Sequence, residues 1–205
     1  RIKKFYEGGG DKPLLFVGFN RRFSAYVQEI KKHTSARINP MIIRYRMNAG
    51  YIPMDHWVHE NGGRMVGEAC HIIDLMTALT GSEVESVFSQ AITPSNEKYS
   101  AEDNKSIVLK YKDGSVANIE YFANGSKELS KEFMEIHFDG KSIVLDDYKS
   151  LKGYGVRVKE ISTNVSQKGQ LEELETLFEA LKGSKKGWPI ELWDMVQTTE
   201  VSFLI

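Results

Sequence analysis

The chain has 205 residues, 41% of them hydrophobic, and its 27 basic and 28 acidic side chains give a net charge of −1. This length can bury a sizeable core, and the balanced charge argues against nucleic acid or an anionic membrane as a partner. No apolar run reaches the roughly 18 residues of a membrane span. The single cysteine excludes an internal disulfide framework and indicates a reducing, cytoplasmic location.

The first quarter of the chain predicts a strand, a helix and a second strand. Residues 12–19, KPLLFVGF, form a short apolar run behind a glycine cluster, which is typical of a buried strand. Apolar residues recur at helical spacing over residues 21–33. Between residues 41 and 48 apolar and polar side chains alternate, so this strand places Arg44 and Arg46 together on one face.

A long loop and a helix come next. Residues 49–66 are aperiodic and rich in aromatic residues, and a loop of this length in a compact domain is more often functional than idle. The stretch GGRMVGEACHIIDLMTALTG, residues 62–81, then predicts a helix that ends near Gly81. Its apolar arc leaves His71 just outside, with Glu68 and Asp74 three residues away on either side.

The rest of the chain groups its strands in one block and closes with helices. Strands are predicted at residues 83–92, 105–111, 115–123, 131–138 and 141–147, followed by a short hairpin over 148–162. Helices are predicted over residues 169–183 and 189–204. This order predicts an α+β fold, a mostly antiparallel sheet with helices packed on one face.

Both faces of the predicted sheet carry apolar residues. One face has Ile107, Leu109, Tyr111, Ala117, Ile119 and Tyr121, and the other has Val108, Val116 and Phe122. Helices on one side cannot cover the other side. We therefore expect a partner sheet, and hence a homodimer or a higher homo-oligomer.

The sequence contains no convincing phosphate-binding loop, metal site or cysteine nucleophile. GGGDKP precedes a strand instead of opening a helix, so it is no phosphate-binding loop. His56 and His59, with Glu68 and His71, are weak evidence for a metal because a site needs three or four converging ligands. Cys70 projects about 100° away from His71 on a helix and is better read as a small buried thiol.

His71 is the strongest candidate for chemistry. A histidine at the border of the core, near Glu68 and Asp74, could have its imidazolium form stabilised and act as a general acid or base. The alternative is a histidine that packs at the edge of the core beside solvated carboxylates. Spacing alone leaves both interpretations open.

Three stretches in order, VGFNRRFS (17–24), NAGYIPMDHW (48–57) and GGRMVGEACHIIDLMTALTG, resemble the glucose–fructose oxidoreductase / inositol dehydrogenase family (Gfo/Idh/MocA), in particular a bacterial branch of it. The resemblance implies an α+β C-terminal domain that contacts substrate and forms the oligomer. Residues 1–19 would be the remnant of an upstream Rossmann domain that binds NAD or NADP. Residues 20–205 would be the C-terminal domain.

The resemblance also implies roles for individual residues. His71 matches the histidine that exchanges a proton with the substrate hydroxyl, and Asp74 matches the aspartate three positions later. Many members carry an aspartate four residues before the histidine. Here that position is Gly67, and Glu68 is the nearest substitute.

Further residues match the surroundings of that site. Tyr51, His56 and Trp57 fall in a stretch that resembles a substrate cleft, although a packed loop is the alternative. Asn20 and Arg21 match positions near the cofactor. Arg46, with Arg44, could hold an anionic substituent, or could be an exposed sheet charge.

The resulting expectation is the C-terminal domain of an NAD(P)-dependent oxidoreductase that acts on a sugar, nucleotide sugar or polyol. NAD or NADP would bind the full-length protein, and this fragment alone would bind neither and be inactive. The alternatives are a non-catalytic domain for sugar binding or assembly, and a metal-dependent hydrolase using His56, His59 and His71.

Overall fold

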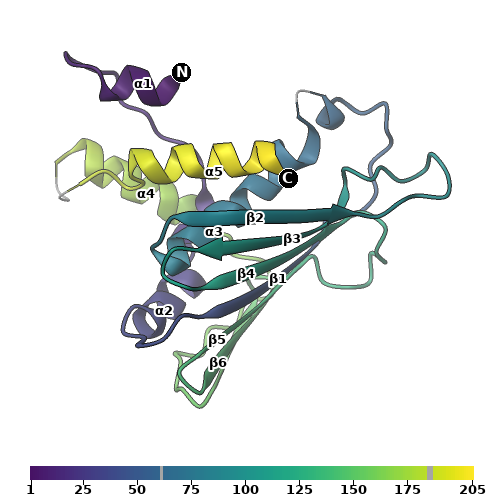
Figure 1. Cartoon of the computed structure of the whole chain (residues 1–205). Coiled ribbons are helices and arrows are strands. Elements are labelled where there is room, and N and C mark those ends of the chain that lie inside the picture. The colour runs from purple at the N-terminus through teal and green to yellow at the C-terminus, as the bar shows by residue number, and fades with distance from the viewer. Residues whose placement is uncertain (61, 184–186) are drawn as a thin grey trace.

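A seven-stranded sheet with helices on one side forms the frame of the chain (Figure 1). The computed structural model describes residues 1–60, 62–183 and 187–205, and the strand order is β2-β3-β4-β1-β5-β6-β7. The strands are β1 Ile42–Asn48, β2 Val84–Ala91, β3 Asn104–Tyr111, β4 Val116–Phe122, β5 Glu132–Phe138, β6 Lys141–Asp146 and β7 Ser150–Tyr154. β1 pairs in parallel with β4, and the other neighbouring strands are antiparallel. The predicted α+β class is confirmed.

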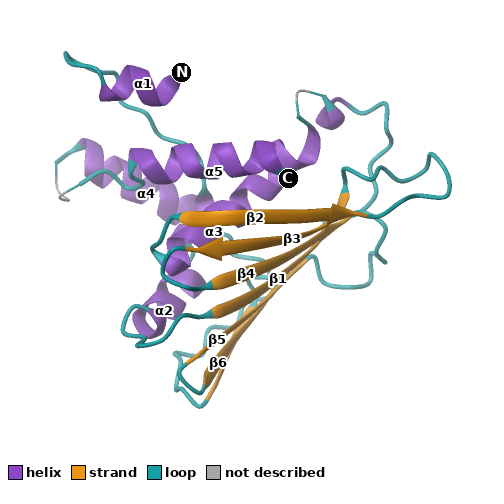
Figure 2. Cartoon of the chain, viewed as in Figure 1, coloured by secondary structure: helices purple, strands orange, loops and turns teal. Residues whose placement is uncertain are grey.

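The helices gather on one face of this sheet (Figure 2). They are α1 Ile2–Glu7, α2 Ala25–Thr34, α3 Cys70–Thr80, α4 Gln170–Leu181 and α5 Leu192–Leu204, with short turns η1 Asn20–Phe23, η2 Trp57–His59 and η3 Met65–Ala69. Among the described residues, none of these helices has the length and apolar content needed to cross a bilayer.

The predicted alternation of side chains along β1 gives the strand one buried and one exposed face. Ile43, Tyr45 and Met47 are fully buried against the helices, whereas Ile42 is 56% exposed on the other face. The six inward residues predicted for β3 and β4 are likewise buried. Successive side chains of a strand point to opposite faces, so the apolar pattern fixes the register against the helices.

Two predicted strands are wrong. Residues 12–19 have no regular secondary structure and join no strand of the sheet. Leu15, Phe16 and Val17 pack instead in a small apolar cluster with Trp188, whose indole N–H donates to the carbonyl of Leu15 at 2.6 Å. Of the hairpin predicted at 148–162, only the first arm forms a strand, β7. The second arm pairs with it through a single bridge between Ser150 and Ser162. Apolar content signals burial, but a strand also needs a neighbour with free backbone groups.

The helices predicted over residues 21–33 and 62–81 each begin with a turn that is not α-helical. The first begins as the 3₁₀ turn η1, and α2 starts only after Ser24, whose hydroxyl accepts from the backbone N–H of Val27 at 3.2 Å. The second begins as the π turn η3, in which the N–H of Cys70 donates to the carbonyl of Met65. It ends as predicted at Gly81, which takes a left-handed conformation with φ of 67°.

A buried ion cluster joins the η1 turn to the helices α3 and α5. Arg22, on η1, donates to both carboxylate oxygens of Asp74 on α3, at 2.9 and 2.5 Å, and also contacts Asp194 on α5 at 2.8 Å. The three side chains are at most 10% exposed. One guanidinium therefore ties η1, α3 and α5 into a single layer over the sheet.

Removing the cation from this cluster should destabilise the fold strongly. Arg22→Met leaves two buried carboxylates without their partner, and we expect the free energy of unfolding to fall by about 3–5 kcal/mol. Arg44→Met is the matched control. Arg44 is 58% exposed and pairs with Glu120 and Glu135 at 3.5 and 3.8 Å, so its loss should cost no more than about 1 kcal/mol. Denaturant unfolding of both variants measures the difference, and equal costs would contradict this account of the cluster.

Candidate active site

His71 lies in the first turn of α3, where it meets the η1 turn. Its ring is partly buried and packs edge-on against Phe19, with the ring centres 5.8 Å apart. Its Nδ1 is buried and has no hydrogen-bond partner among the described residues. Buried polar atoms of this kind are rare and call for a specific explanation, of which a catalytic role is one.

The surroundings of His71 disfavour its charged form. Burial and the nearby positive charge of Arg21 lower the pKa of His71 to about 4, and the carboxylates of Glu132 and Glu68 oppose this shift only in part. The expectation of a stabilised imidazolium is therefore wrong. At neutral pH the imidazole is uncharged and free to accept a proton.

Glu68 faces a different set of groups from those expected. It accepts hydrogen bonds from Tyr121 at 2.5 Å, from Arg64 at 3.0 Å and from Lys131 at 2.8 Å. The pairing of Glu68 with His71 was predicted from a regular α-helix, and η3 is a wider π turn that re-aims the residues preceding α3. Burial alone would raise the pKa of Glu68, but the hydrogen bonds and the positive charges lower it, so Glu68 remains a carboxylate.

Asp74 belongs to the ion cluster of the fold and is fully buried. Both of its carboxylate oxygens are taken up by Arg22, so the predicted interaction with His71 is not formed. Burial raises the pKa of Asp74 and Arg22 opposes that shift. Asp74 therefore positions α3, and with it His71, through the η1 turn.

The two predicted cofactor contacts are engaged inside the domain. Arg21 is 6% exposed and forms a two-pronged pair with Glu132 of β5, at 2.7 and 3.1 Å. Glu132 also accepts from Tyr45 and Lys168. Asn20 donates its amide N–H to the carbonyl of Lys168 at 2.8 Å. Both side chains join η1 to the sheet and to the start of α4.

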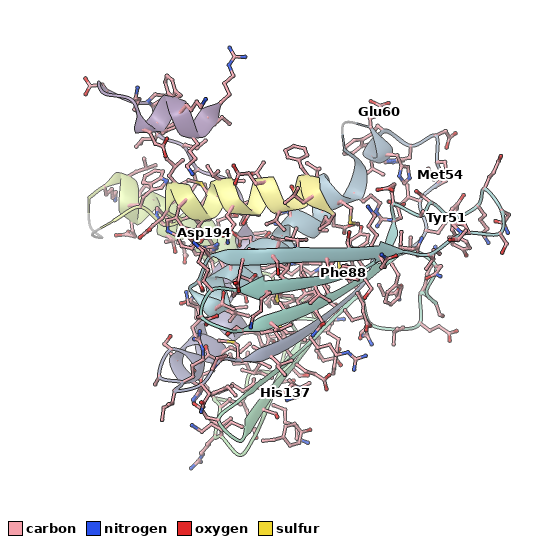
Figure 3. The ribbon with its side chains drawn as sticks, viewed as in Figure 1. Tyr51, Met54, Glu60, Phe88, His137 and Asp194 are labelled. Carbon is pink, nitrogen blue, oxygen red and sulfur yellow. The ribbon has the colours of Figure 1, made fainter. Side chains whose placement is uncertain are left out.

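The loop residues divide into exposed and anchored ones. Trp57 is 72% exposed and Tyr51 is 40% exposed, and Figure 3 shows Tyr51 beyond the end of the strands. The ring of His56 lies 5.5 Å from that of Trp57, and His59 faces Asp103 at 3.6 Å. Residue 61 of the predicted loop lies outside the described residues.

The described part of the chain contains no group of three or more His, Cys, Asp or Glu side chains that could hold a metal. The thiol of Cys70 is a poor nucleophile because burial raises its pKa to about 11. These observations leave His71 as the best candidate for a catalytic residue.

Arg46 is placed on the wrong face for the role that was expected of it. Its neighbours Tyr45 and Met47 point into the core under the helices, so Arg46 points to the opposite side of the sheet. Its guanidinium donates to the carbonyl and hydroxyl of Ser130, at 3.1 and 2.8 Å. Arg46 and His71 therefore do not share a site.

Two hollows border the 49–60 loop. The Trp57 hollow, of about 510 Å³, is lined by residues that include Ile52, Trp57, Glu60, Arg64, Glu68 and Lys131. The Tyr51 hollow, of about 610 Å³, is lined by residues that include Tyr51, Lys127, Glu128, Lys131, Asp147 and Lys149. Lys131 and Ala49 line both hollows.

Sequence reasoning missed several residues of this region. Arg64 is almost fully buried and donates to the carbonyls of Gly50 and Ala49, at 2.7 and 3.1 Å, which fixes the start of the loop. Nothing in the local sequence marks Arg64 or Lys131. Glu132 did give a signal, because the alternation of β5 puts a carboxylate on the buried face, where it requires a partner.

The sequence of this chain is similar to those of a known protein family. The sequence profile of the GFO/IDH/MocA C-terminal domain matches residues 37–144. Inositol 2-dehydrogenase 2 of Saccharopolyspora erythraea is 28% identical over 156 residues, which are 70% of this chain and 44% of that protein. Myo-inositol 2-dehydrogenase of Thermotoga maritima is 27% identical over 112 residues, 52% of this chain and 34% of that protein.

Solved structures agree in fold. Levoglucosan dehydrogenase, solved in complex with NADH and levoglucosan, superposes with a TM-score of 0.69 at 19% identity, over 91% of this chain and 61% of that one. At this identity the likeness establishes the architecture alone. The chain spans less than half the length of the two inositol dehydrogenases.

The charge state of His71 can be measured directly. The imidazole signals of His71 in an NMR titration should move with a pKa well below 6.5, near 4, because burial and Arg21 oppose protonation. Gly67→Asp is an informative variant, since a side chain there meets no atom within 4 Å and adds a carboxylate one turn before His71. It should raise this pKa. A wild-type pKa at or above 6.5 would contradict the description of the site.

Proposed function

The chain belongs to the GFO/IDH/MocA family, and on that basis we propose that it is the substrate-binding domain of an NAD(P)-dependent oxidoreductase that acts on a sugar or a polyol. The observation that carries the proposal is His71, an uncharged imidazole with an unpartnered buried nitrogen. Glu68, whose charge acts on His71, lines a hollow that Trp57 also lines.

In this proposal His71 takes the proton of the substrate hydroxyl. Because its pKa is lowered to about 4, the imidazole is in its accepting form at neutral pH. Bound NAD(P) would supply the hydride acceptor for the carbon that carries the hydroxyl, so the oxidised product would be a ketone.

Glu68 and Lys131 orient the sugar ring of the substrate and do not transfer the proton. Glu68 stays ionised under the influence of Lys131, Tyr121 and Arg64, so it accepts hydrogen bonds from hydroxyl groups. Lys131 is 42% exposed and its ammonium remains available as a donor. Carboxylate and ammonium groups beside the exposed face of Trp57 match the alternating hydroxyls and C–H surfaces of a sugar.

We place the cofactor in a separate nucleotide-binding domain, with residues 1–19 as its end and residues 20–205 as the substrate domain. The exposed surface of α4 supports this. Four apolar side chains of α4, Leu171, Leu174, Phe178 and Leu181, are 53–66% exposed. An apolar stripe of this size is typical of a contact surface.

The first test replaces the proposed proton acceptor. In the longer protein that carries both domains, His71→Ala should lower kcat about 10²- to 10⁴-fold with folding intact, because proton transfer loses its acceptor. His33→Ala, on α2, is the control and should keep the wild-type rate. An unchanged rate in His71→Ala would instead favour a non-catalytic domain for sugar binding or assembly.

The second test concerns assembly through the uncovered face of the sheet. Phe88 and Ile42 are 61% and 56% exposed on this face, and Phe88 and His137 are labelled there in Figure 3. We propose that a second copy packs on it, as the apolar pattern of both faces suggests. Light scattering should then give about twice the 23.3 kDa of the chain. Phe88→Glu should yield the monomer, whereas Val165→Glu, an exposed apolar residue in a loop, should not; a monomeric wild type would contradict the proposal.

A further inference from the structure

The size and shape of the substrate can be inferred from the two hollows together, an inference that rests on the proposed sugar-binding function. Each hollow alone, at about 510 and 610 Å³, falls in the range of about 300–1,000 Å³ that holds a whole small ligand. A single sugar ring in the Trp57 hollow therefore leaves the Tyr51 hollow open beside it.

The two hollows share a polar side chain. Lys131 lines both, and its ammonium is held at 2.8 Å by Glu68, which lines the Trp57 hollow. Ala49, the other shared residue, has a small side chain. A ligand that occupied both hollows would therefore have Lys131 beside it where the two linings meet.

Each hollow has its own aromatic surface. Trp57 lines the first, and Tyr51, with its ring 5.7 Å from that of Tyr99, lines the second. Tyr99 meets Tyr51 at 79°, an edge contact that steadies the Tyr51 ring at its position. Two separated aromatic rings suit two sugar rings, each of which presents an apolar face of C–H groups.

The charges of the Tyr51 hollow favour a neutral ligand. Lys127, Lys131 and Lys149 are offset by Glu128 and Asp147, and Lys149 is paired with Asp147 at 2.8 Å. Lys131 is in turn engaged by Glu68. A phosphate or carboxylate substituent would meet the carboxylates of Glu128 and Asp147 as well as the ammonium groups, whereas hydroxyl groups can donate to the carboxylates and accept from the ammonium groups.

We propose that the substrate is a two-ring carbohydrate, a disaccharide or a glycosylated polyol. Its reacting ring lies against Trp57 beside Glu68, and its second ring lies against Tyr51, with Lys131 at the junction. In this arrangement the Tyr51 hollow supplies specificity for the non-reacting ring, and the chemistry at His71 is the same as for a single ring.

Binding to the chain itself tests this independently of turnover, because both hollows lie within it. The probes are two matched pairs, myo-inositol with galactinol and D-glucose with cellobiose, and glucose 6-phosphate as an anionic ring. In an NMR titration, at least one disaccharide should shift the signals of both Tyr51 and Trp57. We expect it to bind at least tenfold more tightly than its single-ring partner.

Two variants test whether the tighter binding of the two-ring ligand depends on Tyr51. Tyr51→Ala should abolish the preference for two rings, reducing the affinity ratio about tenfold, and Tyr154→Ala, an equally exposed tyrosine on β7, should preserve it. Equal affinity within both pairs, tightest binding of glucose 6-phosphate, or no binding of any probe would overturn the inference. Two-ring binding without NAD(P)-dependent turnover in the longer protein would leave the inference standing and remove the proposed redox function.

Discussion

Two consecutive arginines in one short turn hold the domain together, and the candidate site depends on them. Arg21 reaches down to Glu132 on the buried face of the sheet, and Arg22 reaches across to Asp74 and Asp194 in the helix layer. Buried ion pairs give little net stability but are costly to break, so they act as constraints on position. Together the pairs fix the height and rotation of α3 over the sheet.

That constraint determines the character of His71. The same η1 turn that positions α3 brings the positive charge of Arg21 close to the imidazole, and Phe19 shields one side of the ring. The histidine is therefore kept neutral by the groups that hold the fold. Glu68 serves the neighbouring hollow instead, because the π turn aims it at Tyr121, Arg64 and Lys131. Proton transfer and ring recognition thus fall to different side chains.

The sequence contained most of the fold and only part of the site. Alternation identified the strands from β1 to β6 and their buried faces, because each pattern is local and is set by one sheet. The apolar run at residues 12–19 was a misleading signal, because these residues pack beside Trp188, far along the chain, and pair with none of the described strands. Helical spacing placed Glu68 and Asp74 beside His71, but a π turn and a distant arginine decided their partners. Such long-range competition leaves no local pattern.

We propose that His71 accepts a proton from a sugar bound beside the 49–60 loop. A crystal structure of the longer protein with reduced cofactor and a bound carbohydrate tests this proposal. We expect an imidazole nitrogen of His71 within about 2.6–3.2 Å of the reacting hydroxyl, and the carbohydrate beside Trp57 and Glu68. A carbohydrate bound elsewhere, with His71 packed against the nucleotide-binding domain, would contradict it.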